Sequence, residues 1–221
     1  MRYPYITYSP KIEIQPLFTG LEGEPLIVDM SNEGIIFEKM DVRDQRECQR
    51  RIDQLMAEGK HTWGISSYLE NRKHLLSNCP QMVQEQRFYH LGLDIIVPLG
   101  TPLHTPLEAT VEASGYESGE GNYGGHVLLR HESSDFETFF SLYGHLARTT
   151  LPAAGTQFRP GDIFAHIGDF SDNGNWFYHT HLQVITEKGL EKGYYSKGYC
   201  SGDELATIED LCPAPLSLFR V

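Results

Sequence analysis

The sequence predicts a mainly β protein whose central part is a two-sheet antiparallel β sandwich or barrel-like domain. Three observations lead to this expectation. The 221 residues include 21 Gly and 12 Pro, which interrupt helices and favour turns. The 12 Tyr and 11 Phe are typical of strands. Between residues 88 and 186, short strand-like runs alternate with turn signals, and no convincing helix separates them.

Residues 1–85 have a mixed pattern, and we expect them to form an α+β extension packed on or beside the central domain. The runs IEIQPLF and GEPLIVDM are typical of short strands. A charged helix is expected from Asp41 to Gly59, with Asp41 as its N-cap. The apolar residues that recur at helical spacing within it are Val42, Cys48, Ile52, Leu55 and Met56.

The end of this extension is predicted to contain one more element. A shorter helix is expected over Ser66–Leu76. The segment that follows, Ser77–Gln86, is polar and contains Pro80, so it is predicted to be a connection.

Residues 86–187 are predicted to form the central β domain, and residues 188–221 an irregular C-terminal arm to which we assign no chemistry. The Gly-rich segment GEGNYGG is interpreted as a hairpin turn, because no Lys-Ser/Thr follows it as in a phosphate-binding loop. The strand-like runs of the domain are HLGLDIIV, ATVEASGYES, HVLLRHE, TFFSLYGHLA, DIFAHIGD and HTHLQVIT.

Charge and composition restrict the classes of partner that the protein is expected to bind. A net charge of −12 argues against nucleic acid, because phosphate backbones repel an acidic protein. No run of about 18 apolar residues is present, so no membrane span is expected. The start, MRYPYITYSPKIEIQPL, has no apolar segment of signal-peptide length, and we expect a cytoplasmic protein. The four cysteines form no CxxC pair and are interpreted as isolated buried thiols, although two disulfides are the alternative.

Two short segments concentrate polar ligand types on one strand face. In the run HLGLD, the alternation of a strand puts His90, Gly92 and Asp94 on one face and the leucines on the other. In the run HTHLQV, the same alternation places His179 and His181 side by side over an apolar face. Two such strands can build a metal site if they are neighbours.

The ligand types favour a catalytic metal. Two imidazoles and one carboxylate give three protein ligands and leave a fourth position for water, which is typical of hydrolytic zinc sites. A structural zinc site usually fills all four positions with thiolates, and no cysteine lies near these segments. A metal-activated water also needs a base, and a developing oxyanion needs a donor. Because no Glu lies in these segments, the histidines not used as ligands, His145 in LYGHL and His179, are the candidates.

The three segments HLGLD, LYGHL and HTHLQV, in this order, resemble the HxxxD, YGHL and HxH signatures of the lysostaphin/LytM-type zinc metalloendopeptidases. The intervening PLGTPLHTPLEATVEASG and FRPGDIFAHIGDFSDNG are similar to the strand-and-turn segments of that family. The resemblance covers residues 88–186. Each motif alone is common, but three of them in the family's order form a specific pattern.

The resemblance implies a role for each of five residues. His90 and Asp94 of HxxxD and His181, the second histidine of HxH, would hold one Zn²⁺ per chain. His179 would be the general base that takes a proton from the zinc-bound water, and His145 would stabilise or protonate the tetrahedral intermediate. The fold implied is a LytM-like two-sheet antiparallel β structure with the site in a groove.

The function expected from this resemblance is that of a zinc metallopeptidase, a hydrolase of short peptide or amide bonds. Its substrate would be a peptide or a peptidoglycan fragment. Domains of this type also occur in fusions with intracellular enzymes, which fits an acidic chain. Two alternatives stay open: a non-catalytic zinc-containing peptide-binding or regulatory module, and, by analogy of fold alone, a sugar-phosphotransfer carrier. The extension could be a structural half, a substrate-selecting wall or an inhibitory flap.

The remaining histidines are interpreted as surface or hydrogen-bonded structural residues. They are His61, His74, His104, His126, His131 and His166.

Overall fold

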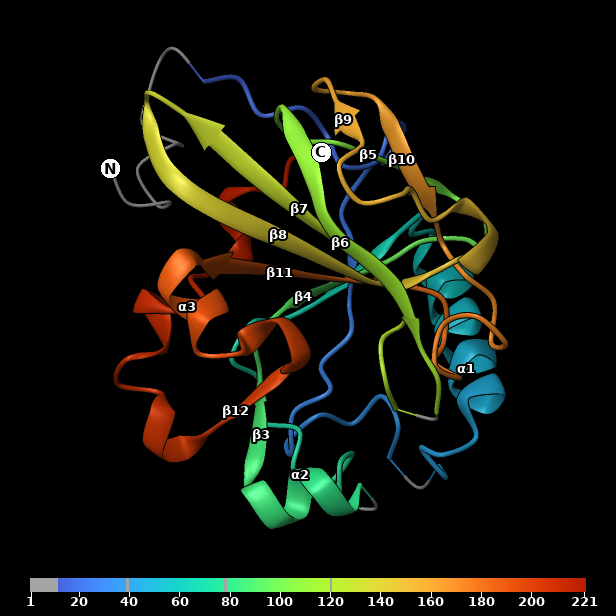
Figure 1. The fold of residues 1–221 in the computed structure, drawn as a ribbon. Coiled ribbons are helices and arrows are strands. Elements are labelled where there is room, and N and C mark those ends of the chain that lie inside the picture. The colour runs from blue at the N-terminus through green and yellow to red at the C-terminus, as the bar shows by residue number, and fades with distance from the viewer. Residues whose placement is uncertain (1–11, 39, 78, 120) are drawn as a thin grey trace.

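The computed structural model describes residues 12–38, 40–77, 79–119 and 121–221 (Figure 1). Over these residues the chain is mainly β, and its largest element is an eight-stranded sheet in the order β1-β2-β4-β11-β8-β7-β6-β9. The strands are β1 (Leu26–Ile27), β2 (Gly64–Ser66), β4 (Leu93–Ile96), β6 (Ala109–Glu117), β7 (Gly124–Ser133), β8 (Phe136–Leu146), β9 (Gln157–Phe158) and β11 (Thr180–Thr186).

Two small sheets accompany the large one. In the first, β5 (Pro102–His104) pairs with β10 (Ile163–His166), and in the second β3 (Arg87–His90) pairs with β12 (Tyr199–Ser201). Within the large sheet β1 and β2 are parallel, and the other neighbouring strands are antiparallel. The prediction of a mainly β fold is confirmed. The described strands form an open sheet packed against smaller ones and do not close into a barrel.

The main core lies between the large sheet and the β5–β10 pair. Strand alternation decides which side chains enter this core. Leu182 and Val184 of β11 face it, whereas His181 and Gln183, which alternate with them along the strand, face the opposite side. On β4, Leu93 and Ile95 likewise enter the core. The large sheet therefore has one mainly apolar face and one face that can carry a site.

The C-terminal arm covers part of that opposite face, as Figure 1 shows for the orange and red segments beside β8 and β11. It begins with α3 (Glu187–Glu191) and contains β12, which pairs with β3. Its apolar side chains pack on the sheet and form a second buried cluster. Among the described residues, short 3-10 helices span Arg148–Thr150, Tyr194–Ser196, Gly202–Glu204, Ile208–Asp210 and Pro215–Ser217, and the last four lie in the arm.

The four cysteines, which all lie in the described part of the chain, are free thiols as expected; three are buried as expected, whereas Cys79 is only partly buried. No helix in the described ranges is both long and apolar enough to cross a bilayer.

The charged helix is confirmed, but its predicted cap is wrong. The helix α1 spans Gln45–Gly59, and the side chain of its N-cap Asp44 accepts the backbone N–H of Glu47 at 2.9 Å. Asp41 instead forms an ion pair with Arg43 at 2.7 Å. Both aspartates precede the apolar repeat, and only the folded chain shows which carboxylate lies over the first turn.

Two other predictions for the extension are also wrong. The expected helix over Ser66–Leu76 begins in β2, whose backbone hydrogen bonds to β4 replace those of a helix. The expected connection contains the short helix α2 (Pro80–Glu85), in which Pro80 occupies a first-turn position where its missing N–H costs nothing. The run IEIQPLF forms no strand, whereas GEPLIVDM contains β1.

The extension contributes strands to the large sheet itself. Because β2 pairs with β4, backbone hydrogen bonds join residues before and after the expected boundary at residue 85. The helix α1 packs through Cys48 and Ile52 against Ile96 of β4 and Phe177. The division into residues 1–85, 86–187 and 188–221 stays a prediction.

His131 behaves as a buried structural residue and allows a prediction about pH. Its Nδ1 donates to the carbonyl of Glu108 at 3.0 Å, and its Nε2 accepts from Ser141 Oγ at 2.7 Å. Burial lowers the pKa of His131 from 6.5 to about 4. The unfolded chain therefore binds a proton there between pH 6.5 and about 4, whereas the folded chain does not.

We expect His131 to make stability fall as the pH drops through this range, by on the order of 3 kcal/mol in total. The stability conferred by the neutral ring is complete above pH 6.5 and is lost as the pH approaches 4. Denaturant unfolding of the wild type and of His131→Gln at several pH values measures this contribution. The variant should show the smaller pH dependence; equal slopes would contradict the prediction.

Candidate metal centre

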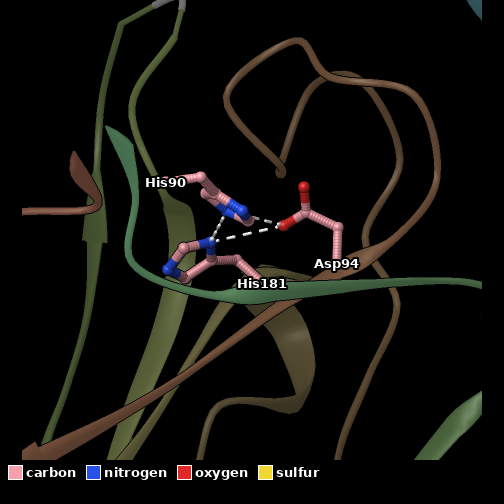
Figure 2. Close-up of side chains that lie close together, drawn as sticks. All are labelled: His90, Asp94 and His181. Atoms are coloured by element: carbon pink, nitrogen blue, oxygen red, sulfur yellow. Dashed lines mark hydrogen bonds and ion pairs between the residues drawn. The ribbon is translucent and has the colours of Figure 1, made fainter. Parts of the chain in front are cut away.

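The pairing of β4 with β11 places two of the predicted ligands opposite each other. His181 is the direct partner of Asp94 across these strands, and on its other side it faces Gly144 of β8. His90 stands at the end of β3, just before the chain bends into β4. Figure 2 shows the rings of His90 and His181 converging on the carboxylate of Asp94.

One sequence expectation about this segment is wrong. His90, Gly92 and Asp94 do not lie on one continuous strand, because the chain bends between β3 and β4, which belong to different sheets. Consequently Leu91 enters the cluster under the C-terminal arm, and Leu93 enters the main core. The bend nevertheless brings the imidazole and the carboxylate to the same site.

The three side chains approach one another closely. His90 Nε2 lies 3.2 Å and His181 Nδ1 lies 3.3 Å from Asp94 Oδ1. The two nitrogens are 2.9 Å apart. All three possible ligand atoms lie within 4.8 Å of one another, and each residue is buried.

Neighbouring groups determine which nitrogens carry hydrogen. The carbonyl of Ser67 can only accept, so His90 donates to it from Nδ1 at 3.1 Å and keeps a lone pair on Nε2. The amide of Gln183 donates from Nε2 to the carbonyls of Tyr194 and Lys197, at 3.3 and 3.2 Å. Its Oε1 is therefore the acceptor for His181 Nε2 at 3.0 Å. The assignment from this network leaves a lone pair on His181 Nδ1 as well.

The two oxygens of the Asp94 carboxylate also have different surroundings. Oδ2 accepts a hydrogen bond from Ser66 Oγ at 3.0 Å and forms an ion pair with Arg72 Nη2 at 2.9 Å. Oδ1, which faces the histidines, is buried and has no hydrogen-bond partner in the part of the chain that the structure describes. Although burial raises the pKa of Asp94, the positive charge of Arg72 holds it well below the ordinary carboxyl value, so the group is ionised.

Three electron-pair donors thus face one another without a proton between them. Burial first, and then the charge of Arg72, lower the pKa of His90 to about 3, so this ring is neutral at pH 7. Buried lone pairs in contact repel each other unless a cation lies between them. Two imidazoles and one carboxylate with an open fourth position form the donor set of a hydrolytic zinc site. The residues present therefore fit a divalent metal ion.

Gly92 makes room for the His181 ring, as a Cβ at position 92 would overlap three atoms of that ring. We expect Gly92→Ala to displace His181 and to weaken zinc binding by roughly 10- to 100-fold, the effect typical of disturbing the support of a ligand. Competition with a chromogenic chelator measures the affinity. Gly115→Ala is the matched control, because its added Cβ would meet nothing closer than 3.4 Å. Equal affinities of the two variants would contradict the prediction.

The two other predicted histidines lie beside this cluster. The ring centroids of His145 and His179 are 4.4 Å apart, and His179 Nε2 lies 3.7 Å from Asp94 Oδ1. Each ring donates from Nδ1 to a backbone carbonyl at 2.8 Å, His145 to Asn173 and His179 to Phe177. Both Nε2 atoms therefore keep lone pairs.

Burial lowers the pKa of both rings, that of His145 well below its ordinary value. The backbone of His145 has φ +66°, an uncommon left-handed conformation for a residue other than Gly. Its N–H and C=O hold it there through bonds to Tyr123 and Gly168, at 2.8 and 3.0 Å.

The structure brings all five predicted side chains to one pocket; their individual roles stay predictions. It also adds residues that the sequence interpretation missed. Gln183 could have been found, since strand alternation puts it on the same face as His181. Arg72 carried no such signal. The C-terminal arm, to which we assigned no chemistry, contributes Gly198 and Tyr199 to the pocket wall.

The comparisons with known proteins agree with the site. Residues 88–192 match the family model described as Peptidase family M23, and this range includes all five predicted residues. The resemblance to lysostaphin/LytM-type peptidases is therefore confirmed. The matched segment is similar to the peptidases of family M23, which indicates a metallopeptidase type of domain. None of the curated proteins compared with the sequence matches it.

Solved structures with detectable similarity include a zinc-containing peptidase from Vibrio cholerae, at 22% identity and TM-score 0.37, over 44% of this chain and 27% of that one. A second is a mutant catalytic domain of the prophage-encoded M23 protein EnpA from Enterococcus faecalis, at 21% identity and TM-score 0.38, over 52% of this chain and 77% of that one. A third is the catalytic domain of lysostaphin from Staphylococcus simulans, at 16% identity and TM-score 0.38, over 53% of this chain and 79% of that one. The match thus spans about a quarter of the Vibrio protein.

Proposed function

We propose that this protein is a zinc-dependent metallopeptidase that hydrolyses short peptide or amide bonds, with peptidoglycan-type peptides as a candidate substrate class. The observation that carries the proposal is the convergence of His90 Nε2, His181 Nδ1 and Asp94 Oδ1, three buried electron-pair donors whose other atoms are all engaged by neighbours. The M23 match over the same residues supports it.

His90, Asp94 and His181 would hold one zinc ion through these atoms. Zinc bound there supplies Lewis acidity, which polarises the scissile carbonyl and lowers the pKa of a coordinated water to about 7. The protein contributes the geometry, since Ser67, Gln183 and Ser66 fix the orientation of the three side chains.

His179 is proposed as the general base. Its Nε2 carries a lone pair and lies 3.7 Å from Asp94 Oδ1, next to the proposed metal position. A neutral imidazole with a free acceptor nitrogen can take the proton of the attacking water. The hydrogen bond from Nδ1 to the carbonyl of Phe177 keeps Nε2 directed into the pocket and stabilises the ring once it is protonated.

His145 has a related but distinct proposed role. In the resting state its Nδ1 hydrogen is committed to Asn173, so its Nε2 is an acceptor and cannot yet donate to an oxyanion. It must first gain a proton. The neighbouring His179 ring, 4.4 Å away between centroids, can supply one directly or through water. Protonated His145 would then stabilise the tetrahedral intermediate or protonate the leaving amine.

The surroundings of the site support a slender peptide as substrate. The five side chains are each at most 6% exposed. The pocket walls come from four separate parts of the chain: Met30, Gln81 and Met82 of the extension, Asn122 and Tyr123 of the β6–β7 hairpin, Trp176 and Phe177 before β11, and Gly198 and Tyr199 of the arm. Peptides with Gly or other small residues at the scissile bond fit such an enclosed site best.

Metal analysis followed by a peptide and muropeptide screen tests the proposed function. We expect one zinc per chain, hydrolysis of at least one peptide class, loss of that hydrolysis with a chelator, and its recovery when zinc is added back. Hydrolysis by the metal-free protein would contradict the proposal. Full zinc occupancy without hydrolysis of any peptide would instead favour a peptide-binding or regulatory module.

A further inference from the structure

The buried arginine Arg72 lies outside the family match and yet contacts the metal centre. It belongs to the extension, upstream of residues 88–192, and is only 2% exposed. Its guanidinium Nη2 lies 2.9 Å from Asp94 Oδ2 and donates to Ser66 Oγ at 2.7 Å. Neither Arg72 nor Ser66 was identified as a site residue from the sequence. Both act on the oxygen of Asp94 that points away from the histidines.

The orientation of Arg72 is fixed from its other side. Its Nε donates to Glu70 Oε2 at 2.8 Å, and its Nη1 donates to the hydroxyl of Tyr199 at 3.4 Å. Glu70 is itself held, because its Oε1 accepts the backbone N–H of Met30 at 2.9 Å. A guanidinium fixed by a carboxylate on one edge presents a rigid pair of N–H groups on the other.

This arrangement restricts how Asp94 can bind a metal. A free carboxylate can coordinate with one oxygen or with both. Oδ2 accepts a hydrogen bond from Ser66 and is paired with the charge of Arg72, so Oδ1 remains for an ion between the two histidines. The positive charge of Arg72 also offsets part of the carboxylate charge, which would leave the ion a stronger Lewis acid.

We propose that Arg72 is a positioning residue of the metal centre: together with Ser66 it holds Oδ2, so that Asp94 offers a single oxygen to the metal. The inference rests on the proposed function. With this role, residues 66–72 of the extension contribute to the function of the metal site. The competing explanation is that Arg72 only braces the extension against the domain.

The test uses the full chain loaded with cobalt in place of zinc, because the visible absorption of Co²⁺ reports its coordination number. The wild type should show the intense bands of a four-coordinate ion. In Arg72→Met the freed Oδ2 can also coordinate, so the bands should weaken towards those of a five-coordinate ion. Zinc affinity, measured by chelator competition, should fall by roughly 10- to 100-fold. Arg72→Lys should restore part of both signals.

Two further variants separate positioning from bracing. Arg87→Met removes another buried arginine, whose side chain is 5% exposed and pairs with Glu85 at 2.6 Å without contacting Asp94. It should lower thermal stability but leave the cobalt spectrum unchanged. Ser66→Ala removes the other donor to Oδ2, and should weaken zinc binding less than Arg72→Met does.

The outcomes distinguish this inference from the proposed function. If Arg72→Met and Ser66→Ala bind zinc as tightly as the wild type and give its cobalt spectrum, Arg72 is only a brace and the inference is wrong, while the proposed function stands. If Arg72→Met does not fold, Ser66→Ala and Arg72→Lys decide by the same readouts. If the wild type binds neither zinc nor cobalt, both proposals fall.

Discussion

Replacing His181 by alanine is expected to remove the metal and the hydrolytic activity together. His181 Nδ1 is one of only three donors at the proposed site, and its loss leaves His90 and Asp94 as a two-ligand site with a water-filled gap. We expect zinc affinity to fall by more than about 100-fold, which is the upper end of the effect seen when only the support of a ligand is lost. Hydrolysis should drop to background, because no activated water remains.

Metal content after dialysis, chelator competition and peptide hydrolysis measure this prediction on the same preparations. His74→Ala is a suitable control, since His74 is exposed and its hydrogen bonds within the described residues go to Asn32 and to Ser77 of its own turn. It should keep both zinc and activity. A His181→Ala protein that retains stoichiometric zinc with wild-type affinity would show that the metal, if present, is bound elsewhere.

Loss of His145 or His179 is expected to have the opposite signature, with zinc retained and turnover lost. Both rings keep their Nε2 lone pairs for proton transfer, and neither is needed to complete the three-donor set. Removing a general acid or base typically lowers the rate by about 10²- to 10⁴-fold. We therefore expect kcat to fall by this factor in each variant, at unchanged zinc content.

The choice of substitution at His145 matters because of its backbone. At φ +66°, alanine is strained, whereas asparagine tolerates the left-handed region better. His145→Asn should thus lose turnover without the added loss of stability expected for His145→Ala. If the two histidines act as one proton-transfer unit, the double variant should be about as slow as either single variant. Loss of zinc in either single variant would make that histidine a ligand.

The local features of the site could be predicted from the sequence. Alternation of polar and apolar residues placed His181 on a face opposite the leucine and valine that enter the core, and β11 has this arrangement. The Gly between His90 and Asp94 leaves room for the ring of His181. Residue types that favour strands and turns were sufficient to indicate the mainly β class, because they act through local backbone conformation.

The errors occurred where similar local signals compete. Asp41 and Asp44 are both suitable caps for α1, and the residues at the end of the extension can form either helical turns or a strand. Local propensity differs little between such alternatives. The pairing of β2 with β4, which depends on a strand about thirty residues further along, decides between them.

By itself, the sequence determined the fold class, the face of its strand on which His181 lies and the types of donor available. Only the tertiary structure decided that His181 stands directly opposite Asp94, that Gln183 fixes its tautomer, and that Arg72 occupies the second oxygen of the carboxylate. The physical reason is the range of the interactions. Periodicity reports hydrogen bonding and burial between near neighbours, whereas a metal centre depends on contacts such as that of His90 with His181, 91 residues apart, which exist only when the chain has folded.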